Sequence, residues 1–142
     1  MVEAWLGNTF ILDDLNNLRN GYKTSHQVAE FPQTVLDKLR WKSSIIYLSK
    51  ESLHHINSDH PDIDDFVMLL LPKMIRNGLI VQEAKKPNIV VVIYQIDETK
   101  RISVILKRAR TGFDIWVSSI HRMKKRQTAS ILKRGFVIQN HK

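Results

Sequence analysis

The sequence contains no cysteine among its 142 residues. Disulfides, thiolate metal sites, iron–sulfur clusters and cysteine nucleophiles are therefore excluded. Apolar runs are short, and Phe66–Leu71, with six residues, is far below the length that crosses a bilayer. Residues 1–15 carry an early acid and no basic region before the apolar positions, unlike a secretory signal. We therefore expect no membrane span and take the cytoplasm as the default compartment.

Several common sequence patterns are also missing. The chain has no internal repeat and no low-complexity stretch, and it contains no P-loop, GxGxxG, GxSxG or EF-hand pattern. These absences argue against nucleotide cofactors, lipase-type catalysis and calcium. We therefore expect no cofactor.

Acidic residues are scarce in the last third of the chain. The net charge is +8, but residues 1–98 sum to −3, whereas residues 99–142 hold one acid, Asp114, and sum to +11. Such asymmetry within one domain indicates a surface that binds a polyanion. A solvated basic tail is the simpler explanation, but much of the charge lies in apolar segments such as residues 102–117, which a disordered tail would not carry.

The first half of the chain predicts helices around one strand. Leu12–Leu18 is a candidate short helix, and Thr34–Trp41 predicts another. Ser44–Leu48 is β-branched and apolar, which favours a strand. Ser49 then offers an N-cap for a helix over Lys50–Asn57.

Proline and glycine divide the next segment. Pro61 ends the preceding helix, because the residue before a proline avoids helical angles. Asp62–Leu71 predicts a second helix, which Pro72 should kink or end. The following residues should close a turn, with Gly78 as the cap.

After Gly78 the pattern predicts strands. They are Leu79–Gln82, Ile89–Ile96, Ile102–Arg108 and Phe113–Ser119, followed by a helix over Lys124–Lys133, Gly135 as its C-cap and a last short strand over Phe136–Ile138. The hairpin-length breaks between the strands indicate an antiparallel meander. Helices followed by a run of strands predict an α+β domain with a four-stranded antiparallel sheet. We expect residues 1–43 to pack as an N-terminal extension on a core of residues 44–142.

Three of the six histidines lie close together, at His54, His55 and His60. Histidine is the side chain best suited to exchange protons near neutral pH. His55 and His60 could line a cleft if the chain turns at Pro61, although an exposed polar face is an equal alternative. A metal site that includes Asp59 is a further alternative, but the spacing matches no zinc signature. We therefore predict no metal.

Strand alternation places two other polar residues. In Ile102–Arg108, Lys107 lies on the face opposite the main apolar stripe, where it could stabilise a phosphorane or simply discourage edge aggregation. In the next strand, alternation places Val117 and Ser119 on one face and Trp116 on the other. An antiparallel pairing puts Lys107 nearer Phe113 than Ser119.

The basic run Arg122–Arg126 resembles a phosphate-contacting helix start. Trp116 and Tyr94 could stack on unpaired bases, although we expect at least one of them in the core. The residues expected to contact RNA are Arg108, Arg110, Trp116, Ser118, His121, Arg122, Lys124 and Lys125.

Two groups of segments together resemble a known family. Leu48–Ile56, Asp59–Asp62 and Leu71–Ile75 resemble the helical half of phage-type BECR nucleases, the group that joins barnase, EndoU, the tRNA-cutting colicins and RelE. Ile102–Lys107 and Trp116–His121 resemble the closing strands of that family. The resemblance covers roughly residues 44–134.

The resemblance implies a metal-independent ribonuclease. In such enzymes the RNA 2′-hydroxyl attacks the neighbouring phosphate, which yields a 2′,3′-cyclic phosphate and a 5′-hydroxyl. Carried over by position, the catalytic residues are His55, His60, Lys107 and Ser119, with Ser118 as the alternate register for the hydroxyl. His121 departs from the pattern, and it replaces an aromatic residue or is itself the acid.

The resulting expectation is an RNA-cutting domain, with tRNA as one candidate substrate, that acts as a toxin or a phage or mobile-element effector. A toxic product would need an inhibitor, and an acidic immunity protein or antitoxin would fit the basic face. The competing hypothesis is a non-catalytic RNA- or DNA-binding module that uses the same basic face. It predicts salt-dependent binding and no cleavage.

Overall fold

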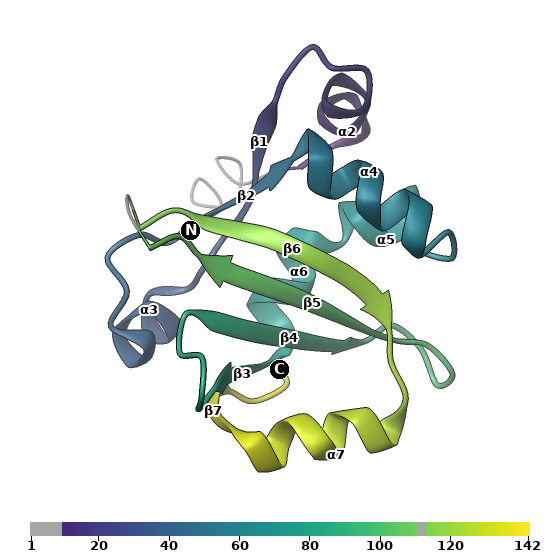
Figure 1. Ribbon diagram of the computed structural model, residues 1–142. Helices are drawn as coiled ribbons and strands as arrows, with labels where there is room; N and C mark the ends of the chain where they lie inside the picture. Colours follow the sequence, from purple (N-terminus) through teal and green to yellow (C-terminus); the bar gives the residue numbers. More distant parts are fainter. Residues whose placement is uncertain (1–9, 111–112) are drawn as a thin grey trace.

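The computed structural model describes residues 10–110 and 113–142. In this part of the chain, six helices and seven strands form an α+β structure around one mixed sheet (Figure 1). The helices are α2 (Leu12–Arg19), α3 (Gln33–Leu39), α4 (Lys50–Asp59), α5 (Asp65–Leu69), α6 (Leu71–Asn77) and α7 (Lys125–Arg134). The strands are β1 (Ser25–Glu30), β2 (Ile45–Ser49), β3 (Leu79–Glu83), β4 (Ile89–Gln95), β5 (Arg101–Arg108), β6 (Ile115–Arg122) and β7 (Gly135–Gln139).

The sheet is larger than the sequence predicts. Its strand order is β1-β2-β6-β5-β4-β3-β7. Strands β3 to β6 form the expected antiparallel meander. The expectation of a four-stranded antiparallel sheet is nevertheless wrong, because β2 joins β6 in parallel, β1 extends that edge and β7 extends the other. The sequence of β1, SHQVAE, has no β-branched run that would mark it, and its backbone pairing with β2 makes it a strand.

Helix α4 begins at Lys50, as the sequence predicts, and runs two residues beyond the expected end at Asn57. The Ser49 hydroxyl accepts a hydrogen bond of 3.1 Å from the backbone N–H of Ser52, which caps the first turn. The helix ends at Asp59, immediately before the His60–Pro61 pair. The end of α4 therefore fixes the position of His60.

Pro72 has a different role from the expected one. It lies in the first turn of α6, where a missing N–H breaks no helical hydrogen bond. The single helix expected over Asp62–Leu71 is therefore wrong, since the shorter α5 precedes α6. The turn expected after Pro72 is helical, but Gly78 is the C-cap as predicted. A Cβ on Gly78 would lie 2.5 Å from the carbonyl oxygen of Met74, which only glycine avoids.

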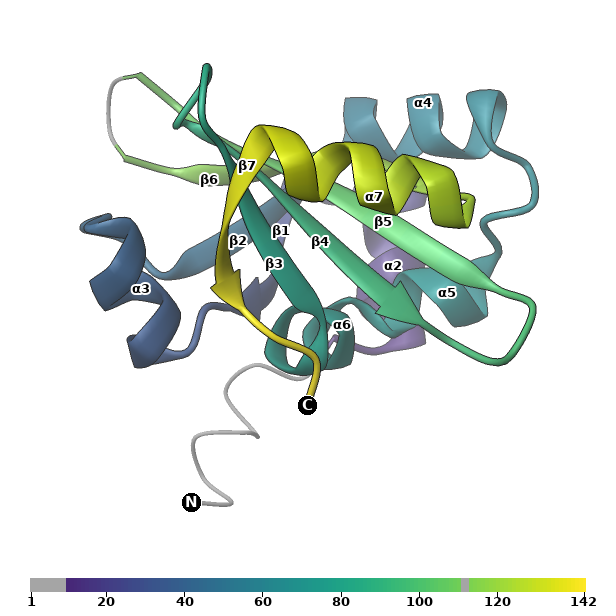
Figure 2. The ribbon, with the colours of Figure 1, turned by 90° about the horizontal axis from the view of Figure 1, so that it is seen from below.

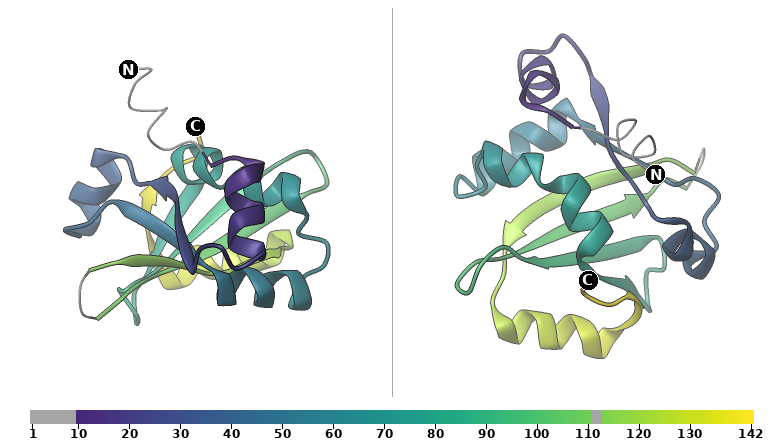
Figure 3. Two further views of the ribbon diagram at one scale, coloured as in Figure 1. Left: turned by 90° about the horizontal axis from the view of Figure 1, so that it is seen from above. Right: turned by 180° about the vertical axis from the view of Figure 1, so that it is seen from behind.

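One face of the sheet carries the main core. Helix α6 crosses the back of the sheet, and α5 and α2 lie on the same side (Figure 3). Leu71, Met74 and Ile75 of α6 are fully buried in one cluster with the inward-facing residues of the strands, such as Val92 and Val104. Each such side chain contributes about 1.5–3 kcal/mol when it leaves water. This core fixes the sheet and leaves its other face available.

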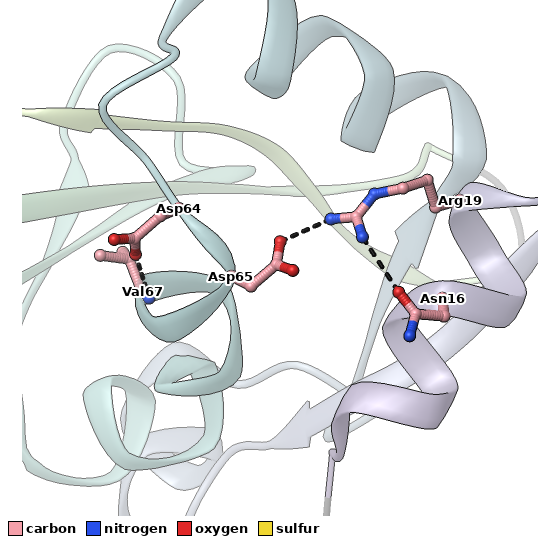
Figure 4. Close-up of polar contacts among 5 residues, drawn as sticks. All are labelled: Asn16, Arg19, Asp64, Asp65 and Val67. Carbon is pink, nitrogen blue, oxygen red and sulfur yellow. Dashed lines mark hydrogen bonds and ion pairs between the residues drawn. The ribbon is translucent and has the colours of Figure 1, made fainter.

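The N-terminal helix is joined to the rest of the structure by both apolar and polar contacts. Leu15 and Leu18 of α2 are fully buried in the main core. The Arg19 guanidinium contacts the Asp65 carboxylate of α5 and the Asn16 side chain (Figure 4). These contacts hold α2 against α5.

The helices of the described ranges are short. The two longest, α4 and α7, have ten residues each. None of the helices in residues 10–110 and 113–142 has the length and apolar character that a membrane crossing requires.

Candidate functional site

The second face of the sheet is only partly covered. Helix α7 lies over β3 and β4, where Ile131 packs on a small apolar cluster that contains Val81 and Val91. Helix α4 flanks β6. Figures 1 and 2 show α4 and α7 on the same side of the sheet, with β5 and β6 running between them. We call the outward-facing residues of these two strands the β5–β6 strip; they are Ser103, Ile105, Lys107, Trp116, Ser119 and His121.

A β-bulge in β6 decides which residues belong to this strip. Ile105 pairs with Ser119, but the next residue, Leu106, pairs with Val117, so Ser118 is inserted without a partner. Strict alternation is broken there. The expectation that Ser119 shares a face with Val117 is therefore wrong, because the bulge turns Ser119 to the outward face, beside His121.

Two histidines from distant segments meet at one end of the strip. The imidazole ring of His60 contacts that of His121 edge to face, with centroids 5.5 Å apart and planes at 88°. The hydroxyl oxygen of Ser103, directly across from His121 in the strand pairing, lies 3.0 Å from its Nδ1 and 3.3 Å from its Nε2. Ser103 is fully buried, so this hydroxyl orients His121 and does not meet solvent. We call His60, His121 and Ser103 the histidine cluster.

The electrostatics of the cluster favour a neutral His121. Burial lowers the pKa of His121 from its ordinary value of 6.5, and the neighbouring charge of His60 lowers it further, while Asp62 acts in the opposite direction. At pH 7 the ring is therefore able to accept a proton. A cavity of about 250 Å³ opens beside it, lined by Ser103 and His121 from the sheet and by Gln127, Ser130 and Arg134 from α7.

The other predicted histidines lie apart from this cluster. His54 and His55 are both exposed on α4, while Leu53 and Ile56 are the buried residues of that helix. His55 follows Ser52 by three positions and so shares its side of the helix. Of the predicted pair His55 and His60, the structure places only His60 in contact with another histidine.

Lys107 lies at the far end of the strip from the histidine cluster. It pairs with Trp116 in the strand register, which agrees with the expectation that it is not opposite Ser119. Lys107 lies four positions after Ser103 on β5, or roughly 13 Å along the strand. Lys107 lines a separate cavity of about 350 Å³ together with Ser52, Trp116 and Ser118. A direct role for Lys107 at the histidines is not supported by this spacing.

The aromatic residues divide between the two faces. Trp116 is half-buried on the outward face and contacts Tyr47, with ring centroids 5.4 Å apart. Tyr94 packs against the main core. The expectation that at least one of Trp116 and Tyr94 belongs to the core is confirmed, and Trp116 is the one available on the β5–β6 face.

The predicted RNA-binding cations fall into two groups. Arg108 and Arg110 both line the cavity with Lys107; Arg110 is exposed, and the guanidinium of Arg108 lies over the ring of Trp41, 5.3 Å from its centroid. The second group consists of Arg122, Lys124 and Lys125, which are exposed and line a cavity of about 670 Å³ where α7 begins. The two groups lie at opposite ends of the β5–β6 strip.

Ser103 is the site residue that the sequence analysis missed. Its only signal is a hydroxyl inside an otherwise apolar strand, which alternation places on the same face as Lys107. The sequence analysis gives Asp62 no role in a catalytic site, yet its carboxylate raises the pKa of His121. Among the described residues, no group of three or more His, Asp or Glu side chains is arranged to hold a metal ion. Comparison of the chain with protein-family models, curated proteins and solved structures gave no match.

Proposed function

We propose that the protein is an endoribonuclease that cleaves RNA by 2′-hydroxyl transesterification without a metal ion, in the manner of the phage-type BECR nucleases it resembles. The observation that carries this proposal is the contact between His60 and His121, held by Ser103 on a basic, partly open sheet face. Two imidazoles supply the proton acceptor and the proton donor that the reaction needs. The surrounding cations attract the phosphodiester backbone.

The two histidines take different roles in this proposal. His121 is the general base, because its lowered pKa keeps the ring neutral at pH 7. It removes the proton from the 2′-hydroxyl as the oxygen attacks phosphorus. His60 is the general acid and gives a proton to the 5′-oxygen as its bond to phosphorus breaks. The products are a 2′,3′-cyclic phosphate and a 5′-hydroxyl.

An in-line reaction places one constraint on this pair. Base and acid must flank the phosphate, so a bound phosphate has to separate the two rings from the contact they make here. His60 follows the last turn of α4 and is half-buried, whereas Ser103 fixes His121. In our proposal, His60 is therefore the ring that moves when substrate binds.

Two further residues complete the proposed site. Ser119 is the next outward residue to His121 on β6, roughly 6–7 Å along the strand, and its hydroxyl can donate to a phosphate oxygen. Arg134 lines the same cavity as Ser103 and His121. We propose that Arg134 stabilises the negative charge that develops on the phosphorane. The sequence analysis gave this role to Lys107, which lies farther from the histidines. Lys107 and Arg110 would instead contact RNA beside Trp116.

The biological role that fits this activity is that of a toxin or a phage or mobile-element effector acting on RNA in the cytoplasm, with tRNA as one candidate substrate. Such an enzyme would need an inhibitor that covers the basic face. An acidic immunity protein or antitoxin has the complementary charge.

The decisive experiment is incubation of the purified full chain with total tRNA and with a mixed RNA pool, each with and without EDTA. We expect fragments with cyclic phosphate ends in both conditions, and loss of at least 100-fold in rate for His121→Ala and His60→Ala. His54→Ala is the matched control, since it removes an exposed histidine from the same helix as His60. Cleavage that stops in EDTA would contradict the metal-independent mechanism.

The alternative of a non-catalytic RNA-binding module has a distinct result in the same experiment. All RNA would stay intact, while salt-sensitive binding would persist equally in the wild type and in both histidine variants. That outcome would overturn the proposed nuclease activity.

A further inference from the structure

A second cavity adjoins the proposed active site at the end of the sheet. Its volume is about 670 Å³, and it lies between the β4–β5 hairpin and the start of α7. Arg101 and Arg122 line it from the strands, and Lys124 and Lys125 line it from the N-cap and first residue of α7. Glu98 is the one acidic residue of the lining. We call this the arginine pocket.

The arginines of this pocket are held in place by neutral groups. The guanidinium of Arg101 donates to the Gln95 side-chain oxygen at 2.9 Å and to the Thr128 hydroxyl at 3.1 Å. The guanidinium of Arg122 donates to the carbonyl oxygen of Thr99 at 3.2 Å. No carboxylate in the described ranges forms an ion pair with either arginine. Their orientation is thus set, while their positive charge stays available.

The start of α7 adds positive charge where a helix favours negative charge. Lys124 is the N-cap, Lys125 follows it, and the first turn of the helix contains no acid. Cations at the positive end of a helix dipole are unfavourable. A bound anion would relieve this repulsion together with that between the two arginines.

The arginine pocket is continuous with the histidine cluster. Met123 and Gln127 line both this pocket and the cavity that contains His121 and Ser103. On β5, Arg101 lies two residues before Ser103 and therefore on the same face of the sheet, roughly 6–7 Å along the strand. An extended RNA strand bound with its cleaved phosphate at the histidines would therefore place a neighbouring phosphate in the arginine pocket.

We propose that the arginine pocket is a phosphate-binding subsite for the RNA strand that flanks the cleaved phosphodiester. Guanidinium groups with fixed orientation bind phosphate oxygens through paired hydrogen bonds. This inference rests on the proposed function for the identity of the ligand, but the subsite itself binds phosphate whether or not cleavage occurs. With this subsite, the protein would bind single-stranded RNA over several nucleotides.

The binding test uses 2′-O-methyl hexaribonucleotides, which have no free 2′-hydroxyl and cannot be cleaved. Binding to the full chain is measured by fluorescence anisotropy at several salt concentrations. For the double variant Arg101→Gln/Arg122→Gln, we expect affinity to fall roughly tenfold or more at low salt. The slope of log affinity against log salt should fall by about 0.7, the value for one phosphate contact on a single strand.

Two control variants test whether the effect on binding is specific to the arginine pocket. Lys73→Gln removes a positive charge from α6, on the opposite face of the sheet, and we expect wild-type affinity and slope. Glu98→Gln removes the acid of the pocket, and we expect tighter binding. Since Arg101 contacts α7 through Thr128, Arg122→Gln alone is also measured, and a thermal melt checks each fold. Equal binding by the wild type, Arg122→Gln and the double variant would overturn the subsite.

Cleavage rates separate the failure of the subsite from the failure of the proposed function. In the double variant, we expect kcat/KM for a hexanucleotide to fall about tenfold more than that for a dinucleotide, which has only the cleaved phosphate. Equal losses would overturn the subsite and leave the nuclease intact. A wild type that cleaves nothing, but whose oligonucleotide binding weakens in the double variant, would overturn the nuclease and leave the subsite.

Discussion

The ring of His60, at the end of α4, meets the ring of His121, on β6, edge to face at 5.5 Å. The two residues come from opposite halves of the chain. The contact exists because α4 packs along β6, the strand with which β2 pairs in parallel. The proposed roles of the two histidines rest on this contact.

The titration of His121 tests the electrostatics of this contact. NMR should give His121 a pKa below 6.5, and His60→Gln should raise it because the neighbouring charge is removed. Asp62→Asn should lower it further, since the carboxylate favours the protonated ring. A pKa for His121 that is identical in all three proteins would contradict the arrangement.

The same pKa shift predicts a pH dependence of stability. The folded state binds its proton at His121 less readily than the unfolded state, whose pKa is about 6.5. The free energy of unfolding should therefore fall as pH drops below that value, until the lower folded pKa is passed. In His121→Gln, urea denaturation at several pH values should show a smaller decrease over this window than the wild type shows.

Ser103 is predicted to be a positioning residue. Ser103→Ala should lower kcat roughly tenfold with little change in KM, because the base loses its orientation while the binding surface remains. The loss of one buried hydrogen bond should also cost about 1 kcal/mol of stability. The nitrogen chemical shifts of the His121 ring should change in Ser103→Ala, and Ser103→Thr should restore the wild-type shifts. If Ser103→Ala lowers the stability but leaves the nitrogen shifts of the His121 ring unchanged, Ser103 has only a structural role.

Ser49 caps α4, the helix that His60 follows, and should therefore contribute to stability. Ser49→Ala should lower the free energy of unfolding by about 1 kcal/mol, since the N–H of Ser52 loses its acceptor. Ser58→Ala, at an exposed position of the same helix, should change it by less than about 0.5 kcal/mol. Urea denaturation measures both. Equal effects of the two substitutions would contradict the capping contact.

Trp116 is predicted to stack on a base of the bound strand. Trp116→Ala should weaken binding of a 2′-O-methyl hexanucleotide by about 1–3 kcal/mol, and Trp116→Phe should retain much of the affinity. Anisotropy titrations give both values. If the alanine variant binds like the wild type, Trp116 serves only to pack against Tyr47.

Much of the local structure is predictable because local signals specify it. The Ser49 cap, the stop before Pro61 and the cap at Gly78 act within one or two helical turns, and each is found where the sequence places it. Pro72 was misread because proline is compatible with the first turn of a helix as well as with a helix end.

The candidate site was only half predictable. The sequence names His60 as a candidate catalytic residue, places His121 among the residues expected to contact RNA and marks the basic last third of the chain, but it overlooks Ser103. The bulge at Ser118 explains part of this difference, since a single inserted residue moves Ser119 and His121 to the opposite face from the one alternation gives.

The sequence by itself determines an α+β chain without cysteine, with a basic last third and an antiparallel meander, because composition and short-range periodicity specify these features. Only the tertiary structure decides that β1, β2 and β7 extend the sheet and that His60 meets His121. Strand pairing and helix docking draw their stability from contacts between residues far apart in the chain. No local pattern records which of those partners will meet.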